Sequence, residues 1–348
     1  MRVHRPPWSY AMIGADVRAH RQDITVTNSA LAIQPDALHA ALVRLMGRAV
    51  DEHDPVPLGS GAWSRAFGFT AEGRTLVVRV GRHVDDFHRD RLAAAFRSEA
   101  LPIPEVLRID PVPELGDGLF ACVSTRAEGT FIDGLDEAGM RALLPSLLAT
   151  FDTLRAADLS HTTGYGGWDI TGNGASPTWR EALLAVAIDH PDGRGHGWLR
   201  KLEQSQFGLD AWHTLLARLE SALDAIDAQG VVVGRHLIHS DMLNFNVLCD
   251  PDRHRISALF DWGCAMTGDP LHDLAWFAFW QPWYPAWREI DIVGAMRDHL
   301  ESHGVSLPAF DERLRACMFF IALAELAYIV SIDRWADVDP YIARAMQI

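Results

Sequence analysis

The sequence predicts an α+β protein of two lobes, in which a small antiparallel sheet with one helix precedes a larger, mostly helical lobe. Its 348 residues are enough for two domains of roughly 150 residues each. Short runs rich in β-branched and aromatic residues gather in the first third of the chain, whereas apolar residues at helical spacing dominate after Glu137. We place an N-terminal leader at residues 1–34 and the lobes at residues 35–127 and 128–348.

The first lobe is expected to begin with a helix, because Leu38, Leu42 and Leu45 share one helical face and Asp36 precedes them as a candidate cap. A second helix is expected over residues 86–99, where two prolines soon follow. Three short β-rich runs are separated by Gly, Asp and Glu turns, and lie at residues 66–70, 76–80 and 119–123.

The second lobe is expected to be built mainly from helices, at residues 137–157, 178–190, 209–229, 271–280, 289–303 and 309–332. Two extended runs, 246–249 and 256–260, lie among them and are joined by a turn. The last helix is apolar enough to raise the question of a membrane span. Because Glu325 lies near its middle and an intramembrane carboxylate is costly, we expect a buried core helix instead.

Composition and charge exclude several classes of protein. The chain is 49% hydrophobic and 22% charged, which is typical of globular proteins, and its net charge of −15 argues against binding nucleic acid. The four cysteines show no C-x-x-C spacing, and the N-terminus lacks the apolar stretch of a signal peptide. We therefore expect a cytoplasmic monomer that binds neither nucleic acid nor a membrane.

The negative charge is concentrated in the second lobe. Residues 1–130 hold 15 Arg and 16 Asp or Glu, whereas the remainder holds 16 basic and 30 acidic residues. Such asymmetry fits an anionic ligand on the first lobe and a cationic one on the second, although solubility alone is an alternative explanation.

The strongest motif is H-x-D-x-x-x-x-N, from His239 through Asp241 to Asn246, followed by D-x-G at Asp261. Phosphoryl transfer from a nucleotide to a hydroxyl needs a carboxylate to orient and deprotonate the hydroxyl, and oxygen ligands to hold Mg²⁺ against the phosphates. We predict Asp241 as the catalytic base, and Asn246 and Asp261 as catalytic metal ligands from the two ends of a hairpin. His239 is expected to orient this loop.

A rival interpretation makes His239 and Asp241 ligands of a hydrolytic metal site. Such a site needs further ligands, and the nearest histidines, His236, His254 and His272, have no recognisable ligand spacing.

A nucleotide-phosphate site is predicted in the first lobe from a glycine turn and one arginine. The chain has a single lysine, in the helical lobe, so Arg79 takes the place of a phosphate-pairing lysine on a strand. Strand alternation puts Val78 and Val80 on one face and Arg79 on the other, where Asp90 or Glu99 could orient it. A turn just before the preceding strand, 66–70, could approach phosphates through its glycine amides and serine hydroxyls, at Gly59, Ser60, Gly61 and Ser64.

These residues resemble the aminoglycoside phosphotransferase family, and most closely the hygromycin B phosphotransferases. The resemblance runs from about Leu58 to Trp287 and includes the segments 64–67, 101–107, 156–160 and 279–283. It implies a protein-kinase-like two-lobed fold, ATP or GTP with Mg²⁺, and transfer of the γ-phosphoryl group to a hydroxyl of a cationic antibiotic, which would confer resistance. It also implies a hinge over residues 123–127 that receives the base, with Val123, Thr125 and Ala127 as contacts.

The acceptor site is expected on the acidic helical lobe. Its candidate residues are carboxylates and an amide near the catalytic loop, with aromatic rings that could stack on sugars or ammonium groups, namely Asp241, Asn244, Asp269, Asp273, Trp280 and Trp283. Two alternatives remain open: a kinase of another small-molecule hydroxyl, such as a macrolide, a choline-like compound or a sugar, and a non-catalytic nucleotide-binding regulator.

Overall fold

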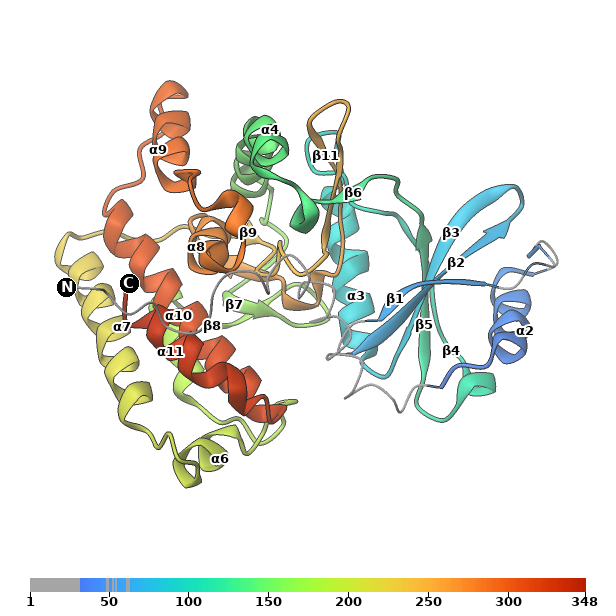
Figure 1. The fold of residues 1–348 in the computed structure, drawn as a ribbon, viewed down its shortest axis with the longest axis horizontal. Helices are drawn as coiled ribbons and strands as arrows, with labels where there is room; N and C mark the ends of the chain where they lie inside the picture. Colours follow the sequence, from blue (N-terminus) through green and yellow to red (C-terminus); the bar gives the residue numbers. More distant parts are fainter. Residues whose placement is uncertain (1–31, 48–49, 52, 54, 61–62) are drawn as a thin grey trace, which may run out of the picture. The chain divides into compact units, whose positions relative to one another are not determined.

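The computed structural model describes residues 32–47, 50, 51, 53, 55–60 and 63–348, and these fall into two compact units (Figure 1). Among the described residues, the first unit comprises those from 32 to 143 together with 245–263 and 283–288, and the second comprises residues 144–244, 264–282 and 289–348. The hairpin that carries Asn246 and Asp261 therefore belongs to the first unit. The predicted lobe boundary at residue 127 stays a prediction, and most of the proposed leader lies outside the described residues.

The first unit is built on a five-stranded antiparallel sheet with the order β1-β2-β3-β5-β4. A second, three-stranded sheet has the order β11-β10-β6, and helix α4 begins in this unit. The elements are α2 (Pro35–Met46), β1 (Val56–Ser60), β2 (Ser64–Ala71), β3 (Arg74–Gly81), α3 (Val84–Ala93), β4 (Val106–Pro111), β5 (Phe120–Thr125), β6 (Thr130–Phe131), α4 (Glu137–Ala156), β10 (Val247–Asp250) and β11 (Arg255–Leu259).

Helices α2 and α3 lie on opposite sides of the five-stranded sheet (Figure 1). The buried core on the α2 side contains Leu38 and Leu42 of the helix with Val78 and Val80 of β3. Because side chains alternate along a strand, Arg79 projects to the α3 side, as the sequence predicted.

The start of α2 differs in one detail from the prediction. Gln34 is the N-cap and Pro35 occupies the first turn, so Asp36 lies inside the helix instead of capping it. Proline fits this position because its missing N–H would have no intrahelical partner there. Asp36 still favours the helix, since a carboxylate in the first turn interacts well with the helix dipole.

The second unit is mostly helical around the long helix α10, which packs against α7 and α8. A four-stranded antiparallel sheet with the order β8-β7-β12-β9 completes it. The elements are β7 (Tyr165–Trp168), β8 (Gly174–Ser176), α5 (Trp179–Leu184), α6 (Trp198–Gln204), α7 (Asp210–Ala228), β9 (His236–Ile238), β12 (Met266–Gly268), α8 (His272–Trp280), α9 (Ile292–Ser302), α10 (Phe310–Ser331) and α11 (Val338–Ala345).

Short 3-10 helices link these elements, at Ala94–Phe96, Pro113–Leu115, Ile132–Gly134, Ala185–Ala187, Trp262–Cys264, Gln281–Trp283, Pro285–Trp287 and Trp335–Asp337.

Helix α10 is the one described helix that is long and apolar enough to cross a membrane, with a mean hydropathy of 1.8 over its most apolar window. Within the structure, 61% of that window is buried. Its buried residues run around the helix, from Leu314 and Cys317 to Ile329 and Val330, as in the core helix of a globular unit.

Candidate active site

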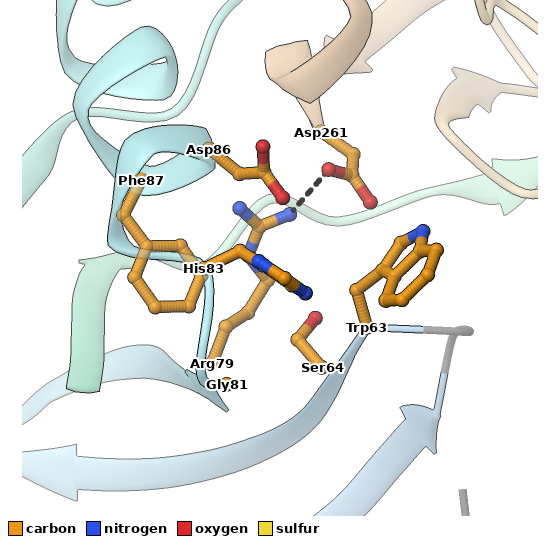
Figure 2. A pocket seen from close by; sticks show the side chains of 8 residues that line it. All are labelled: Trp63, Ser64, Arg79, Gly81, His83, Asp86, Phe87 and Asp261. Atoms are coloured by element: carbon orange, nitrogen blue, oxygen red, sulfur yellow. Dashed lines mark ion pairs between the residues drawn. The ribbon is translucent and has the colours of Figure 1, made fainter. Parts of the chain in front are cut away.

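The first unit gathers a buried cation between two carboxylates from distant parts of the chain. Arg79 of β3 forms an ion pair with Asp90 of α3, and its Nη1 lies 3.1 Å from Oδ1 of Asp261 (Figure 2). The other carboxylate oxygen of Asp90 accepts a hydrogen bond of 2.8 Å from the backbone N–H of Trp262. Asp90 therefore fixes both the arginine and the segment that carries Asp261, and the expected alternative partner, Glu99, is not used.

The environment keeps Arg79 charged. Burial alone would lower the pKa of its guanidinium, but the carboxylates of Asp90 and Asp261 raise it well above its ordinary value. The guanidinium also lies over the ring of Phe87, 5.2 Å from the ring centroid. A fixed cation with two-point geometry is suited to holding phosphate oxygens.

A cavity of about 50 Å³ opens beside this cation (Figure 2). Three of the predicted site residues, Ser64, Arg79 and Asp261, line this cavity. The other lining residues were not singled out from the sequence, and they are Trp63, Gly81, His83, Asp86 and Phe87. Gly81 is required by close packing, since a Cβ there would meet the backbone oxygen of Trp63 at 2.7 Å. Such a tight approach at the end of a strand is invisible in the sequence.

The glycine turn is described only in part. Gly59 and Ser60 end strand β1 and Ser64 begins β2, where it lines the cavity, but Gly61 lies outside the described residues. Ser64 shares that cavity with Arg79, and its contact with phosphates stays a prediction. The roles of Gly59, Ser60 and Gly61 stay predictions.

The candidate magnesium ligands lie together at one end of the β10–β11 hairpin. Asn246 directly precedes β10, Asp261 follows β11 closely, and the backbone oxygen of Asn246 accepts a hydrogen bond of 3.1 Å from Phe260. Asn246 is buried, and the Asp261 side chain is 47% exposed. A carboxylate and an amide at one hairpin end are oxygen donors of the kind that Mg²⁺ binds, so the residues fit the ion.

Asp261 also adopts an unusual backbone conformation, with a φ of +65°. This left-handed region is uncommon for residues other than glycine, although Asp tolerates it better than most. Strained positions of this kind concentrate at functional sites, because the surrounding structure must hold them in place. Here the hydrogen bond from the adjacent Trp262 N–H to Asp90 provides that constraint.

The hinge predicted over residues 123–127 covers the last three residues of strand β5 and the two residues that follow it. Val123 is fully buried and pairs with Val78, and the backbone N–H of Thr125 donates to Glu105 at 3.0 Å. The backbone of Ala127, just beyond the strand, makes no hydrogen bond to any described residue. The backbone groups of Ala127 are therefore available to a ligand, and the base contacts at Val123, Thr125 and Ala127 stay predictions.

The second unit holds the Asp241 loop in a fixed conformation. The Asp273 carboxylate accepts hydrogen bonds from the backbone N–H groups of His239 (3.0 Å) and Ser240 (2.8 Å). The backbone N–H of Asp241 donates to Nδ1 of His239, which confirms the orienting role expected for that histidine. Ser240 has a φ of +64°, so the loop is held in a conformation that it would not adopt without these partners.

The Asp241 carboxylate is itself oriented. The Asn244 side chain donates a hydrogen bond of 2.8 Å to Oδ1 of Asp241, and Asn244 has a φ of +62°. A carboxylate held by a neighbouring amide on a clamped loop is preorganised to accept a proton from a substrate hydroxyl. The rival hydrolytic metal site receives no support, because His239 and His272 are buried, Nδ1 of His239 pairs with the backbone N–H of Asp241, and Nε2 of His272 pairs with the Ser240 hydroxyl.

Two predicted acceptor contacts are wrong. Asp269 is fully buried, and both of its carboxylate oxygens accept hydrogen bonds from Arg313, at 2.8 and 2.9 Å. Asp273 is 3% exposed and clamps the catalytic loop, so it positions Asp241 instead of binding the acceptor. Burial raises the pKa of Asp273 to about 6, against the opposing effect of the two N–H donors.

The two predicted aromatic contacts differ in their surroundings. The half-buried Trp280 packs against Trp276, Phe279 and Tyr341 of its own unit. Trp283 belongs to the first unit and is also half-buried. Stacking of either ring on an acceptor stays a prediction.

A cation paired between a strand and a helix, beside two oxygen donors on a hairpin, defines a phosphoryl-transfer enzyme of the kinase-like class. Comparisons with known proteins agree with this class: the phosphotransferase enzyme family matches residues 54–309. A hygromycin-B 4-O-kinase from Escherichia coli is 36% identical over 276 residues, which span 78% of this chain and 74% of that relative. The chain belongs to the phosphotransferase enzyme family.

Solved structures show the same relationship. The crystal structure of aminoglycoside phosphotransferase APH(4)-Ia matches with a TM-score of 0.73 at 30% identity, covering 90% of this chain and 98% of that one. A thermostable mutant of that enzyme, in ternary complex with AMP-PNP and hygromycin B, matches with a TM-score of 0.70 at 32% identity, covering 89% and 97%. Aminoglycoside 2′-phosphotransferase-IIIa, at 14% identity and a TM-score of 0.57 over 90% and 97%, shares the fold.

Proposed function

We propose that this enzyme transfers the γ-phosphoryl group of ATP to a hydroxyl of an aminoglycoside, with hygromycin B as the first candidate, and thereby confers resistance to it. The observation that carries the chemistry is the Asp241 carboxylate, which Asn244 holds on a loop clamped by Asp273. A similar hygromycin-B 4-O-kinase supports the choice of acceptor. Complexes of related enzymes with AMP-PNP and with ADP support an adenine nucleotide.

In this proposal Asp241 accepts the proton of the acceptor hydroxyl as the hydroxyl oxygen attacks the γ-phosphorus in line, while the bond to the β-phosphate oxygen breaks and ADP leaves. Arg79 holds phosphate oxygens, and its pairing with Asp90 keeps the guanidinium in place before the nucleotide arrives. Asn246 and Asp261 would hold Mg²⁺, which when bound neutralises charge on the phosphates. Positioning and electrostatics supply most of the rate in such reactions, so residues that fix these groups matter as much as the base.

A cationic acceptor requires carboxylates that are not already used inside the protein. Asp269 and Asp273 are used internally, whereas Glu325 of α10 forms no hydrogen bond or ion pair with any described residue. Burial raises the pKa of Glu325 to about 7, against the opposing charge of Arg334. Tyr328, one helical turn further on, experiences the charges of both Glu325 and Asp241, so these groups share one region of the second unit. We therefore assign Glu325 to the acceptor site.

The substitution Glu325→Gln is expected to make the protein more stable at alkaline pH. The pKa of Glu325 in the folded state lies above the ordinary value of 4.5. The contribution of this group to the stability of the native protein is therefore highest below pH 4.5, where the carboxyl is neutral in both states, and it falls as the pH rises through about 7. Allowing for the partial exposure of the side chain, the variant should gain about 2 kcal/mol over the native protein at pH 8 and almost nothing at pH 4.5. Urea unfolding at both pH values measures the difference.

The same variant tests the assignment to the acceptor site. Loss of the carboxylate should raise the KM for a cationic acceptor at pH 8 by about tenfold, as for one charged hydrogen bond, and leave the KM for ATP unchanged. An unchanged acceptor KM, together with the predicted gain in stability, would make Glu325 a core residue without a role in recognition.

The proposed function is tested with an acceptor screen on the purified enzyme. Nucleotide turnover is measured with hygromycin B, other aminoglycosides, a macrolide, choline and simple sugars, and phosphorylated products are identified by mass spectrometry. We expect hygromycin B or another aminoglycoside to give the highest kcat/KM, and bacteria that express the enzyme to tolerate that antibiotic. Preferred turnover of choline, a sugar or a macrolide would replace this proposal with the broader alternative of a small-molecule kinase.

A further inference from the structure

Three side chains that bind metal ions well lie together in the second unit, outside the residues assigned to the active site. Asp152 lies on helix α4, His299 on α9, and His303 directly after α9. One potential ligand atom from each lies within 4.8 Å of those of the other two. It is the one such group of three His, Cys, Asp or Glu side chains among the described residues.

The two histidines have the spacing that a metal site requires, and His303 has the tautomer. They are four residues apart, so their rings share one helical face, with ring centroids 4.3 Å apart. Nδ1 of His303 lies 2.8 Å from the backbone oxygen of His299, which accepts only, so Nδ1 carries the proton. Nε2 of His303 therefore carries a lone pair. A ligating histidine is commonly fixed by exactly such a bond from its other ring nitrogen to a carbonyl.

The carboxylate is ionised and divided between two partners. Oδ1 of Asp152 accepts hydrogen bonds from Arg155, at 3.0 and 3.3 Å, and Oδ2 lies 2.6 Å from Nε2 of His299. Although burial opposes the charged form, these hydrogen bonds from His299 and Arg155 lower the pKa of Asp152 below its ordinary value. Arg155 repels a cation but also holds the carboxylate so that Oδ2 faces the imidazoles.

We propose that Asp152, His299 and His303 bind a zinc ion that links α4 to α9. Two imidazoles and a carboxylate are ligands that Zn²⁺ favours, and three protein ligands leave a fourth position for water. The ion would take the place of the hydrogen bond between Asp152 and His299, so that Oδ2 and Nε2 become ligands. Binding weakens as the pH falls, because metal ligands must be deprotonated. Because His303 is exposed, the ion has a path from solvent.

The test is calorimetric titration of the full chain with ZnCl₂ in excess Mg²⁺, which occupies sites made of oxygen donors alone. We expect the native protein to bind one zinc ion per chain under these conditions. His299→Gln keeps a hydrogen-bond donor to Asp152 but removes the imidazole, and His303→Ala removes an exposed ring, so both should fold normally. Each substitution should weaken zinc binding by about 10-fold or more.

Two matched controls separate this site from adventitious binding. His213→Ala removes an exposed histidine on α7, and Cys264→Ser removes an exposed thiol, so both should bind zinc as the native protein does. Co²⁺ should give visible absorption bands of a tetrahedral site that disappear in His299→Gln. Zinc should raise the melting temperature of the native protein and of both controls, but not that of His299→Gln. Equal zinc affinity in the native protein and in the His299→Gln/His303→Ala double variant, or no zinc binding by the native protein, would overturn the proposal.

Discussion

Replacing Asp241 by Asn is expected to reduce kcat by about 10³-fold or more while changing nucleotide affinity less than twofold. The substitution is isosteric and keeps an oxygen that can accept the hydrogen bond from Asn244, so the loop geometry should survive. What it removes is the basic oxygen that takes the proton of the acceptor hydroxyl, and a positioned general base contributes about 10²- to 10⁴-fold. Steady-state turnover with the best acceptor and calorimetric titration with AMP-PNP measure the two quantities.

A matched control is the same chemical change at Asp252, an exposed residue in the turn between β10 and β11. Asp252→Asn should retain native kinetics, and both variants should melt within about 2 °C of the native protein because neither disturbs the core. Native turnover by Asp241→Asn would refute the assignment of the base. A parallel loss of nucleotide affinity would instead show that Asp241 acts in binding.

The parts of this site that could be predicted from the sequence depend on short-range patterns. The alternation of Leu76, Val78 and Val80 predicts that the Arg79 side chain lies on the opposite face of its strand. The turn between two β-rich runs predicts a hairpin with Asn246 and Asp261 at one end. Both patterns act within a strand or across a tight turn. Their consequences follow from local geometry with no knowledge of the rest of the chain.

The parts that could not be predicted depend on partners far apart in the chain. Asp269 and Asp273 look like available carboxylates in the sequence, but their partners lie 44 and 33 or 34 residues away, in Arg313 and in the catalytic loop. Strands β1 and β4 were missed because both are edge strands with mostly exposed or half-buried side chains, and Pro57 and Gly59 weaken the β signal of the first. Tertiary contacts decide such cases.

The substitution Arg79→Ala is expected to lower kcat/KM for ATP by about 10²-fold and to destabilise the protein by about 3 kcal/mol. The first effect follows from loss of the cation that holds phosphate oxygens in line. The second follows because Asp90, whose side chain is only 11% exposed, would lose the guanidinium that stabilises its buried carboxylate. Nucleotide titration and urea unfolding separate the two effects.

Variants of Asp90 and a second variant of Arg79 test whether the loss of kcat/KM for ATP and the loss of stability have different origins. Asp90→Asn keeps an oxygen for the Trp262 N–H and removes the charge, so Arg79→Ala/Asp90→Asn should regain most of the lost stability. It should regain none of the nucleotide affinity, because no cation returns. Arg79→Lys keeps a charge but cannot span Asp90 and Asp261 with two nitrogens, and should fall between native and Arg79→Ala in both measurements. Unchanged ATP affinity in Arg79→Ala would show that this arginine does not bind the phosphates. A double variant as unstable as Arg79→Ala would show that the stability of this region does not depend on the Arg79–Asp90 ion pair.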